Sequence, residues 1–404
     1  MAQRPAVTEI PCAQESPEMK TTGDGVKRAR ALARSQPWDV IVIGAGPAGG
    51  AAAQILATSG LRLLVIERHL LPRDKACGGA MPAGNGFVEE DGNGVPLESR
   101  CTRVVTLHAG RPLATQARLE SPILMARRQD MDLALLSRAI DSAHGSIHLR
   151  DGVRVTGLEE TSTHVRVRLS DGSIENALHV IGADGAASMA ARVPGLRRKA
   201  PMGAAIDIEV ALDPVRHSRF YQEALFDFYC LPSGYGWIFP KHGYLSCGVI
   251  AWQPSGSLRA HAQRFLRTHL PMGQARVVRQ SAHPVPGYDG RHPVATDRIL
   301  LAGDAARLVD PVIGEGIRYA FLSGRLAAEA ILRVRGSNPE ESHRWGDGRG
   351  VGSAGERYQA SVAAHVAPLL DPIWRFGVVT FLHAPEIYCR TLRQGAYSKP
   401  MPDS

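Results

Sequence analysis

Apolar residues along the chain fall into short runs that are separated by turns rich in glycine and proline. The first run, 38–43, is continuous and β-branched, which is typical of a buried parallel strand. Residues 48–58 are rich in alanine with helical spacing, and 61–67 form a second apolar run. Together these segments predict a βαβ unit.

Later segments extend both patterns. Residues 179–185 and 298–304 each predict a buried strand that ends in a turn, and 316–333 predict a long helix. The alternating, aromatic-rich stretch 203–280 predicts an antiparallel sheet. Residues 72–98 show no periodicity and predict a long loop. Further strands are expected at 104–107, 123–126, 147–149, 153–158 and 165–169, and further helices at 131–143 and 358–392.

The composition narrows the class of protein. Of 404 residues, 44% are hydrophobic and 21% are charged, as in an ordinary globular protein. The 47 basic and 39 acidic residues give a net charge of +8, but they are spread along the chain, so we expect no nucleic-acid partner. The 6 cysteines form no CxxC pair, so we expect no zinc or iron–sulfur site, no other metal, and a reducing cytoplasm.

Membrane contact is the second question that the composition addresses. No apolar run is long enough to predict a membrane-spanning helix. The polar segment 1–37, mixed in charge, predicts a flexible extension and not a signal peptide. The stretch 366–388 contains Trp374 and Phe376, and it predicts either a peripheral membrane contact or ordinary core helices. We therefore expect a cytoplasmic protein, either free or peripheral to a membrane.

A glycine-rich motif lies between the first predicted strand and the first predicted helix. Gly44 permits a tight turn, Gly46 lets the backbone approach a pyrophosphate, and Gly49 allows the helix to pack closely on the sheet. Glu67 ends the next strand, where its carboxylate would accept hydrogen bonds from ribose hydroxyls, and Arg68 beside it is a further expected cofactor contact. The motif predicts a dinucleotide site, with an unrelated glycine-rich turn as the alternative. It does not separate NAD from FAD.

Three later segments favour FAD by resemblance. They are Arg128-Gln129-Asp130-Met131-Asp132-Leu133-Ala134-Leu135, Gly182-Ala183-Asp184-Gly185-Ala186-Ala187-Ser188 and Ala302-Gly303-Asp304-Ala305-Ala306. Their order resembles that of flavoproteins with the aromatic-hydroxylase fold. The resemblance implies that Arg128 approaches the FAD and that the turn Asp184-Gly185 lies near it. It also implies that Asp304, which follows Gly303, holds the ribityl chain.

Further stretches resemble the geranylgeranyl reductases, over residues 39–331. Lys75-Ala76-Cys77-Gly78-Gly79-Ala80-Met81-Pro82 resembles their loop of a cysteine followed by two glycines. Tyr235-Gly236-Trp237-Ile238-Phe239-Pro240-Lys241 resembles their Tyr-x-Trp-x-Phe-Pro-Lys substrate motif. Asp310-Pro311-Val312-Ile313-Gly314-Glu315-Gly316-Ile317 resembles the segment that follows their Gly-Asp motif.

The residue types agree with this resemblance around the flavin. Gly78 and Gly79 carry no side chains, so the backbone there can border the flat isoalloxazine ring. Gly314, Gly316 and Ile317 open a predicted helix whose N–H groups would face the flavin or its phosphates, and a simple helix cap is the alternative.

The residue types also suggest a substrate surface. Tyr235, Trp237 and Phe239 alternate, so all three project from one face of a strand. They form either an apolar wall for a polyprenyl chain or ordinary core packing. Lys241 would contact an anionic head group or face water. Cys77 is either a reactive, proton-handling thiol or a small buried hydrophobe.

These features predict an FAD-dependent oxidoreductase that, as the resemblance implies, reduces isolated C=C bonds of a geranylgeranyl chain. Reduced flavin would supply hydride, and Cys77 or Tyr235 would supply the proton. The electron donor stays open between NADPH and a ferredoxin, because no second dinucleotide motif is visible. The rival functions are a flavin monooxygenase or halogenase of the same fold, a quinone-linked electron-transfer flavoprotein dehydrogenase, and a non-enzymatic lipid-binding relative.

The expected fold is α/β (α+β overall), with a Rossmann-like FAD-binding domain interleaved with an antiparallel β-sheet substrate domain and C-terminal helices. The expected segments are a flexible extension (1–37), FAD-binding parts (38–100, 123–200 and 289–335), substrate-domain strands (101–122), an antiparallel substrate-binding domain (201–288), a mobile linker (336–356) and C-terminal helices (357–404).

Overall fold

The structure is a computed structural model, and it describes residues 36–116, 119–196, 202–253, 256–271, 273, 275–290, 293–336 and 352–393. The described residues from Trp38 onward belong to one compact unit. Most of the predicted extension (1–37) and of the predicted linker (336–356) lies outside the described residues. The linker prediction is wrong at its end, because a helix already begins at Ala354. The division of the unit into FAD-binding and substrate-binding segments stays a prediction.

The first sheet contains the predicted βαβ unit. Within the described residues its order is β8-β2-β1-β11-β10-β9, and β17 also pairs with β11. The strands are β1 (Trp38–Ile43), β2 (Leu63–Ile66), β8 (Ile147–Arg150), β9 (Val155–Glu160), β10 (Val165–Leu169), β11 (Ile174–Gly182) and β17 (Ile299–Leu301). β1 pairs in parallel with both β2 and β11. It is buried from Val40 to Ile43, as its continuous apolar run predicts.

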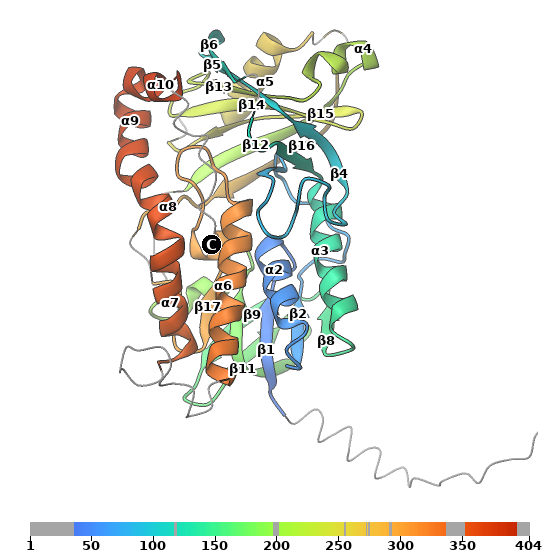
Figure 1. Cartoon of the computed structure of the whole chain (residues 1–404), viewed down its shortest axis with the longest axis vertical. Helices are drawn as coiled ribbons and strands as arrows, with labels where there is room; N and C mark the ends of the chain where they lie inside the picture. The colour runs from blue at the N-terminus through green and yellow to red at the C-terminus, as the bar shows by residue number, and fades with distance from the viewer. Residues whose placement is uncertain are drawn as a thin grey trace, which may run out of the picture. The chain divides into compact units, whose positions relative to one another are not determined.

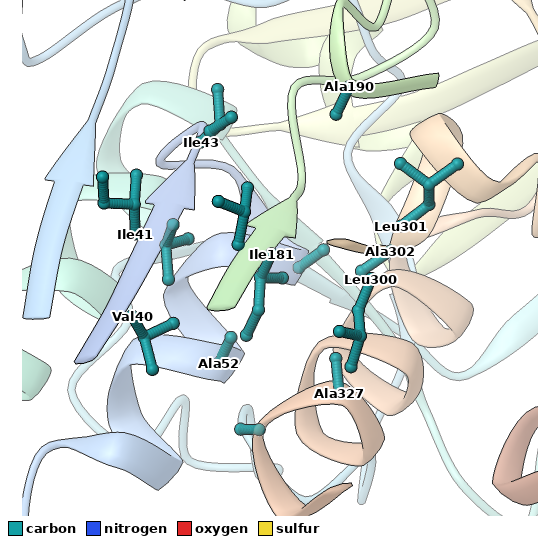
Figure 2. Packing of buried hydrophobic residues seen from close by; sticks show 14 of the residues in the cluster. Val40, Ile41, Ile43, Ala52, Ile181, Ala190, Leu300, Leu301, Ala302 and Ala327 are labelled. Carbon is teal, nitrogen blue, oxygen red and sulfur yellow. The ribbon is translucent and has the colours of Figure 1, made fainter. Parts of the chain in front are cut away.

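Helices cover this sheet (Figure 1). They are α2 (Pro47–Leu56), α3 (Arg128–Ser142), α6 (Ile317–Gly336) and α7 (Ala354–His365). Figure 2 shows side chains of β1, β11 and β17 packed around Ala52 of α2 and Ala327 of α6. A Cβ on Gly324 of α6 would lie 2.2 Å from the carbonyl oxygen of Ala48, so only glycine lets α2 and α6 come this close.

The second sheet is antiparallel except for one parallel pair, β13 with β5. Its order is β16-β12-β15-β14-β13-β5-β6. The strands are β5 (Arg103–His108), β6 (Arg111–Gln116), β12 (Gly203–Ala211), β13 (Glu223–Phe228), β14 (Gly234–Lys241), β15 (Tyr244–Ala251) and β16 (Arg276–Val285). Helix α5 (Leu258–His269) packs on one face through Phe265 and Leu266, and aromatic side chains of β13 and β14 cluster on the other.

Smaller elements complete the fold. A three-stranded sheet of β3 (Ala80–Pro82), β7 (Ile123–Ala126) and β4 (Leu97–Cys101) lies beside β14. The short helix α4 (Pro214–His217) follows β12. After α7 come α8 (Ala367–Pro372), a π-helical turn (Ile373–Gly377), α9 (Val378–His383) and α10 (Pro385–Arg393).

The C-terminal helices pack on the second sheet. Phe381 and Tyr388 are buried and make ring contacts with Phe228 of β13. Phe376 is 71% exposed, so part of the apolar stretch noted in the sequence faces outward. Among the described residues, no helix has both the length and the apolar character needed to cross a bilayer. The peripheral membrane contact stays a prediction.

The α/β fold with an added antiparallel sheet is confirmed, and the sequence-based boundaries differ in instructive ways. The predicted sheet over 203–280 is wrong at α5, because the buried residues Ala262, Phe265 and Leu266 recur at helical rather than alternating spacing. β11 begins before residue 179, since its first half pairs with β10 and alternates in burial. The predicted loop over 72–98 contains β3.

Candidate active site

Two cavities adjoin between the first and second sheets. The larger, of ≈ 680 Å³, is lined by the ends of β1, β2 and β11, by α2 and by β16. The smaller, of ≈ 350 Å³, is lined by β12, β13, β14, β15 and the 75–82 loop. Pro47, Lys75, Arg128, His283 and Asp304 line both cavities, so one elongated ligand can occupy both.

The predicted site residues divide between these cavities. On the larger cavity lie Gly44, Gly46, Glu67, Arg68, Asp184, Gly185 and Gly303. On the smaller cavity lie Cys77, Gly78, Gly79, Tyr235, Trp237, Phe239, Gly314, Gly316 and Ile317. Arg128 and Asp304 line both, whereas Gly49 and Lys241 line neither.

The turn between β1 and α2 is shaped by its glycines. Gly44 has φ +100°, and a Cβ there would lie 2.3 Å from the carbonyl oxygen of Ala183. A Cβ on Gly49 would lie 1.8 Å from the carbonyl oxygen of Gly44, so the helix can pack here only without a side chain. No side chain caps α2 at Gly46. Its first N–H groups are therefore available to an anionic ligand in the larger cavity.

A buried network of two carboxylates and two guanidinium groups lies beside this turn. Glu67 Oε2 accepts a hydrogen bond from Ala45 N at 2.9 Å and pairs with Arg73 Nε at 3.2 Å. Arg73 also pairs with Asp132 at 3.0 Å, and Arg128 donates to both oxygens of Asp132 at 3.0 and 2.9 Å. Burial alone would lower the pKa of Arg128, but Asp132 and Cys77 raise it, so the guanidinium stays charged.

Sequence reasoning missed Arg73, because its role depends on contacts with two distant carboxylates. It also left Lys75 without a role. Lys75 Nζ pairs with Asp304 Oδ2 at 3.1 Å, where the two cavities meet. Burial raises the pKa of Asp304, but Lys75 and the nearby Arg128 lower it below its usual range, so the carboxylate stays ionised.

The turn after β11 lines the larger cavity and leaves space beside it. Asp184 accepts hydrogen bonds from Ser188 Oγ and from Met189 N, both at 2.5 Å, so its carboxylate mainly fixes the turn. Gly185 has φ +78° and open space where a Cβ would lie. Across the cavity, Ser281 Oγ is buried and has no hydrogen-bond partner. A bound polar ligand would satisfy this hydroxyl.

The smaller cavity has an aromatic wall. Tyr235, Trp237 and Phe239 project from one face of β14, as predicted, with ring centroids 6.3 and 6.2 Å apart. Phe226 of β13 adds a fourth ring, 5.3 Å from that of Phe239. A Cβ on Gly78 would lie 2.9 Å from the Phe239 ring, so the 75–82 loop passes directly over this wall. The wall suits a flat or elongated apolar ligand.

Lys241 does not face water. Its side chain is 3% exposed, and Nζ donates to the carbonyl oxygens of Ala126 at 3.1 Å and Gly79 at 3.5 Å. Burial lowers the pKa of Lys241 to about 8, while Cys77 and other acidic neighbours raise it. Of the two alternatives for Lys241, the one in which it faces water is wrong, because this side chain turns inward and ties the Gly79 backbone to β7. The contact with an anionic head group stays a prediction.

The two predicted acids lie on the smaller cavity. The hydroxyl of Tyr235 donates to the carbonyl oxygen of Ile313, and burial, together with Asp310 and Cys77, raises its pKa above the usual range. Cys77 is partly exposed, and its Sγ accepts a hydrogen bond from Gly79 N at 3.3 Å. Both side chains can therefore meet a substrate, but the tyrosine proton is already engaged.

The strands β12 and β16 supply lining residues that sequence reasoning missed. Asp207 is 4% exposed on the smaller cavity, and His283 lines both cavities. Burial lowers the pKa of His283 to about 4, as do Lys75 and Arg128, so its imidazole is neutral at neutral pH. In the part of the chain that the structure describes, no cluster of side chains could hold a metal ion.

Known proteins resemble this chain along most of its length. The family described as pyridine nucleotide-disulphide oxidoreductase matches residues 38–215. A chloroplastic geranylgeranyl diphosphate reductase of Oryza sativa subsp. japonica is 32% identical and spans 72% of this chain and 66% of the relative. A digeranylgeranylglycerophospholipid reductase 2 of Methanothermobacter thermautotrophicus is 32% identical, with 73% and 78% covered. The chain belongs to the geranylgeranyl reductase family of FAD-dependent oxidoreductases.

Other relatives mark the breadth of this reductase family and its fold. A menaquinone reductase of Mycobacterium tuberculosis is 31% identical over 72% of this chain and 76% of its own. The crystal structure of a geranylgeranyl bacteriochlorophyll reductase-like protein from Thermoplasma acidophilum has a TM-score of 0.71 at 20% identity, covering 89% and 90% of the chains. A halogenase in complex with FAD has a TM-score of 0.65 at 18% identity, covering 86% and 76%. These two structural likenesses show the fold alone.

The residues of the reductase fit an FAD molecule. The uncapped start of α2 suits a pyrophosphate, and the unpartnered Ser281 hydroxyl lies on the same cavity. At Gly185 the space where a side chain would lie is open, which leaves room for a ligand. The smaller cavity adjoins at Lys75 and Asp304, so a dinucleotide can extend from one cavity into the other.

Proposed function

We propose that this reductase adds hydrogen to isolated C=C bonds of a polyprenyl chain. The observation that carries the proposal is the aromatic wall of Tyr235, Trp237 and Phe239, which lines a cavity adjoining the predicted FAD cavity. An apolar wall beside a redox cofactor favours a hydrocarbon substrate. Relatives named for geranylgeranyl, digeranylgeranyl and menaquinone substrates support the same class.

In this proposal the FAD lies along the larger cavity. Gly44, Gly46 and Gly49 shape the pyrophosphate turn, and Glu67 with Arg68 borders the adenosine ribose. The Glu67 carboxylate already accepts a hydrogen bond from Ala45 N and pairs with Arg73, so it would accept hydrogen bonds from the ribose hydroxyls through its remaining lone pairs.

The remaining cofactor contacts follow the cavity towards the smaller one. Those we assign are Gly78, Gly79, Arg128, Asp184, Gly185, Gly303, Asp304, Gly314, Gly316 and Ile317. Reduced FAD supplies the hydride. The chain holds the prenyl group against the aromatic wall, excludes water and supplies a proton, for which the sequence offers Cys77 and Tyr235.

An anaerobic experiment tests the proposal. The purified yellow protein is reduced with dithionite and mixed with geranylgeranyl diphosphate or a prenylated quinone, and flavin reoxidation and product mass are followed. We expect reoxidation with products that gain two hydrogens for each step. Protein that stays reduced with every prenyl substrate until oxygen enters would refute the proposal and favour a monooxygenase. Dithionite keeps the result independent of the natural donor, for which NADPH and a ferredoxin are then compared.

The same experiment, carried out on variants, tests which side chain donates the proton. Activity unchanged in both Cys77→Ala and Tyr235→Phe would remove both side chains from the mechanism. A loss in only one of them, with FAD still bound, would support that side chain.

A further inference from the structure

Asp207 lies on the wall of the smaller cavity, midway along β12. Its side chain is 4% exposed, and its Oδ1 accepts a hydrogen bond from Ser246 Oγ at 2.7 Å. A carboxylate removed from water in this way is costly unless it is paired or protonated. None of the roles proposed above uses this group.

The carboxyl group is continuous with the aromatic wall. Asp207, Gly248 and Trp237 are aligned across β12, β15 and β14, which lie side by side in the second sheet. A Cβ on Gly248 would lie 2.2 Å from the Trp237 ring, so the indole occupies the place of the missing side chain. Trp237 Nε1 donates to Ser246 Oγ at 3.4 Å, and Ser246 donates to Asp207. The indole therefore extends from the wall to the carboxyl group.

The charges around Asp207 compensate it only in part. Arg279 of β16 lies 3.9 Å from Asp207 but 2.7 Å from Glu209, which is the closer partner. The pKa of Asp207 is raised to about 6, chiefly by burial and to a smaller extent by Glu209. The hydrogen bond from Ser246 and the charges of Lys241 and Arg279 lower it. Asp207 therefore gains and loses a proton close to neutral pH.

Of the two acids predicted from the sequence, Tyr235 is less well arranged than Asp207 to give up a proton. The Tyr235 hydroxyl already donates to Ile313, and its pKa is raised. Cys77 accepts a hydrogen bond through its sulfur from Gly79 N, which does not engage its own proton, so the Cys77→Ala variant must be tested directly against Asp207. Asp207 lines the same cavity, and because Ser246 donates to its Oδ1, its Oδ2 is the oxygen that can carry the proton.

We infer that Asp207 is the acid that protonates the C=C bond, an inference that rests on the proposed function. The π electrons of the alkene form a new C–H bond with this proton, while the O–H bond of Asp207 breaks and leaves its electron pair on the carboxylate. The hydride that reduced FAD supplies forms the second C–H bond. A proton from water then restores the carboxyl group. Lining the cavity at the end of the indole, Asp207 can touch a substrate that lies along the wall.

The decisive variant is Asp207→Asn, because the amide oxygen can still accept the Ser246 hydrogen bond but the side chain cannot release a proton. We expect anaerobic reoxidation of the reduced, FAD-loaded protein by geranylgeranyl diphosphate to slow by about 10²-fold or more, which is the usual size of a general-acid effect. Asp207→Glu should recover part of the rate. The matched control is Asp227→Asn, which changes a buried carboxyl group on the α5 side of the same sheet. Its reoxidation rate should stay within about threefold of the wild-type rate.

Two readouts separate a proton donor from a structural group. The wild-type rate should fall as pH rises above about 6, and this dependence should be lost in Asp207→Asn. Difference infrared spectra of the FAD-free and FAD-loaded protein should show a carboxyl group that titrates in the same range and disappears in Asp207→Asn. This second readout needs no turnover.

The outcomes are distinct. Wild-type protein that reduces no prenyl substrate overturns the proposed function, whatever the infrared result. Two outcomes with an active wild type overturn the assignment to Asp207. In one, the reoxidation rate of Asp207→Asn stays within about threefold of the wild-type rate; in the other, only Cys77→Ala loses most of this rate. An infrared titration that is unchanged in Asp207→Asn overturns it as well.

Discussion

The buried carboxyl group of Asp207 should make the protein less stable as pH rises. Its pKa is 3.8 in the unfolded chain and about 6 in the folded protein, because burial disfavours the carboxylate. The folded state thus holds the proton more tightly, so stability is highest below the unfolded pKa and is lost as pH rises towards the folded pKa. Two pKa units correspond to about 3 kcal/mol, an upper limit because the protein can relax around the charge.

Substituting asparagine removes this pH-dependent penalty. Asp207→Asn also leaves one amide N–H group without an assured acceptor, which costs about 1–3 kcal/mol at every pH. The difference between two pH values cancels that constant cost. Between about pH 4.5 and about pH 8, where roughly two thirds of this pH-dependent change takes place, we expect the variant to gain up to about 2 kcal/mol relative to wild type.

Thermal unfolding with saturating FAD, of both proteins at both pH values, measures this gain. Because bound FAD raises Tm by mass action, its concentration is kept the same in all four samples. A Tm difference between Asp207→Asn and wild type that is the same at both pH values would refute the reasoning, because it would mean that Asp207 does not change its ionisation with folding.

Three other substitutions test the aromatic wall, the packing of α2 on α6 and the anchoring of the 75–82 loop. Gly78→Ala places a Cβ 2.9 Å from the Phe239 ring, so kcat/KM for prenyl substrates should fall by about tenfold or more while the visible FAD spectrum persists; an unchanged kcat/KM would contradict this close approach. Gly324→Ala forces a Cβ against the carbonyl oxygen of Ala48, and should cost about 1–3 kcal/mol in thermal unfolding. Lys241→Met should raise KM more than it lowers kcat, because the loop loses its anchor; a normal KM in steady-state assays would argue against that role.

Local signals made most of the fold predictable. The β-branched run of β1, the glycine turn and the alanine-rich start of α2 are adjacent in the chain, so sequence alone predicts the βαβ unit. Alternation on β14 likewise predicts that Tyr235, Trp237 and Phe239 share a face, which the structure confirms. In each case the physical cause lies within a few residues of its effect.

The unpredicted parts depend on contacts between distant residues. Asp207 and Glu209 alternate with apolar neighbours on β12, a pattern that is typical of a solvent-facing strand. In the structure Asp207 lines the smaller cavity together with the 75–82 loop and the aromatic wall, and Glu209 pairs with Arg279 at 2.7 Å. The burial of Lys241 cannot be predicted for the same reason, because nothing near it in the sequence shows that the carbonyl groups of Gly79 and Ala126 accept hydrogen bonds from its ammonium group.

The charges on the smaller cavity are balanced by pairing. Lys75 pairs with Asp304 at 3.1 Å, and Arg318 pairs with Glu315 at 3.3 Å. Paired charges produce a weak field, which keeps the cavity suitable for a hydrocarbon. Asp207 differs from these carboxylates because the guanidinium of Arg279 lies closer to Glu209 than to it. An incompletely paired carboxylate becomes neutral by binding a proton, and filling the cavity with a prenyl chain removes more water and strengthens that tendency. Substrate binding should therefore load this acid with the proton that the reaction consumes.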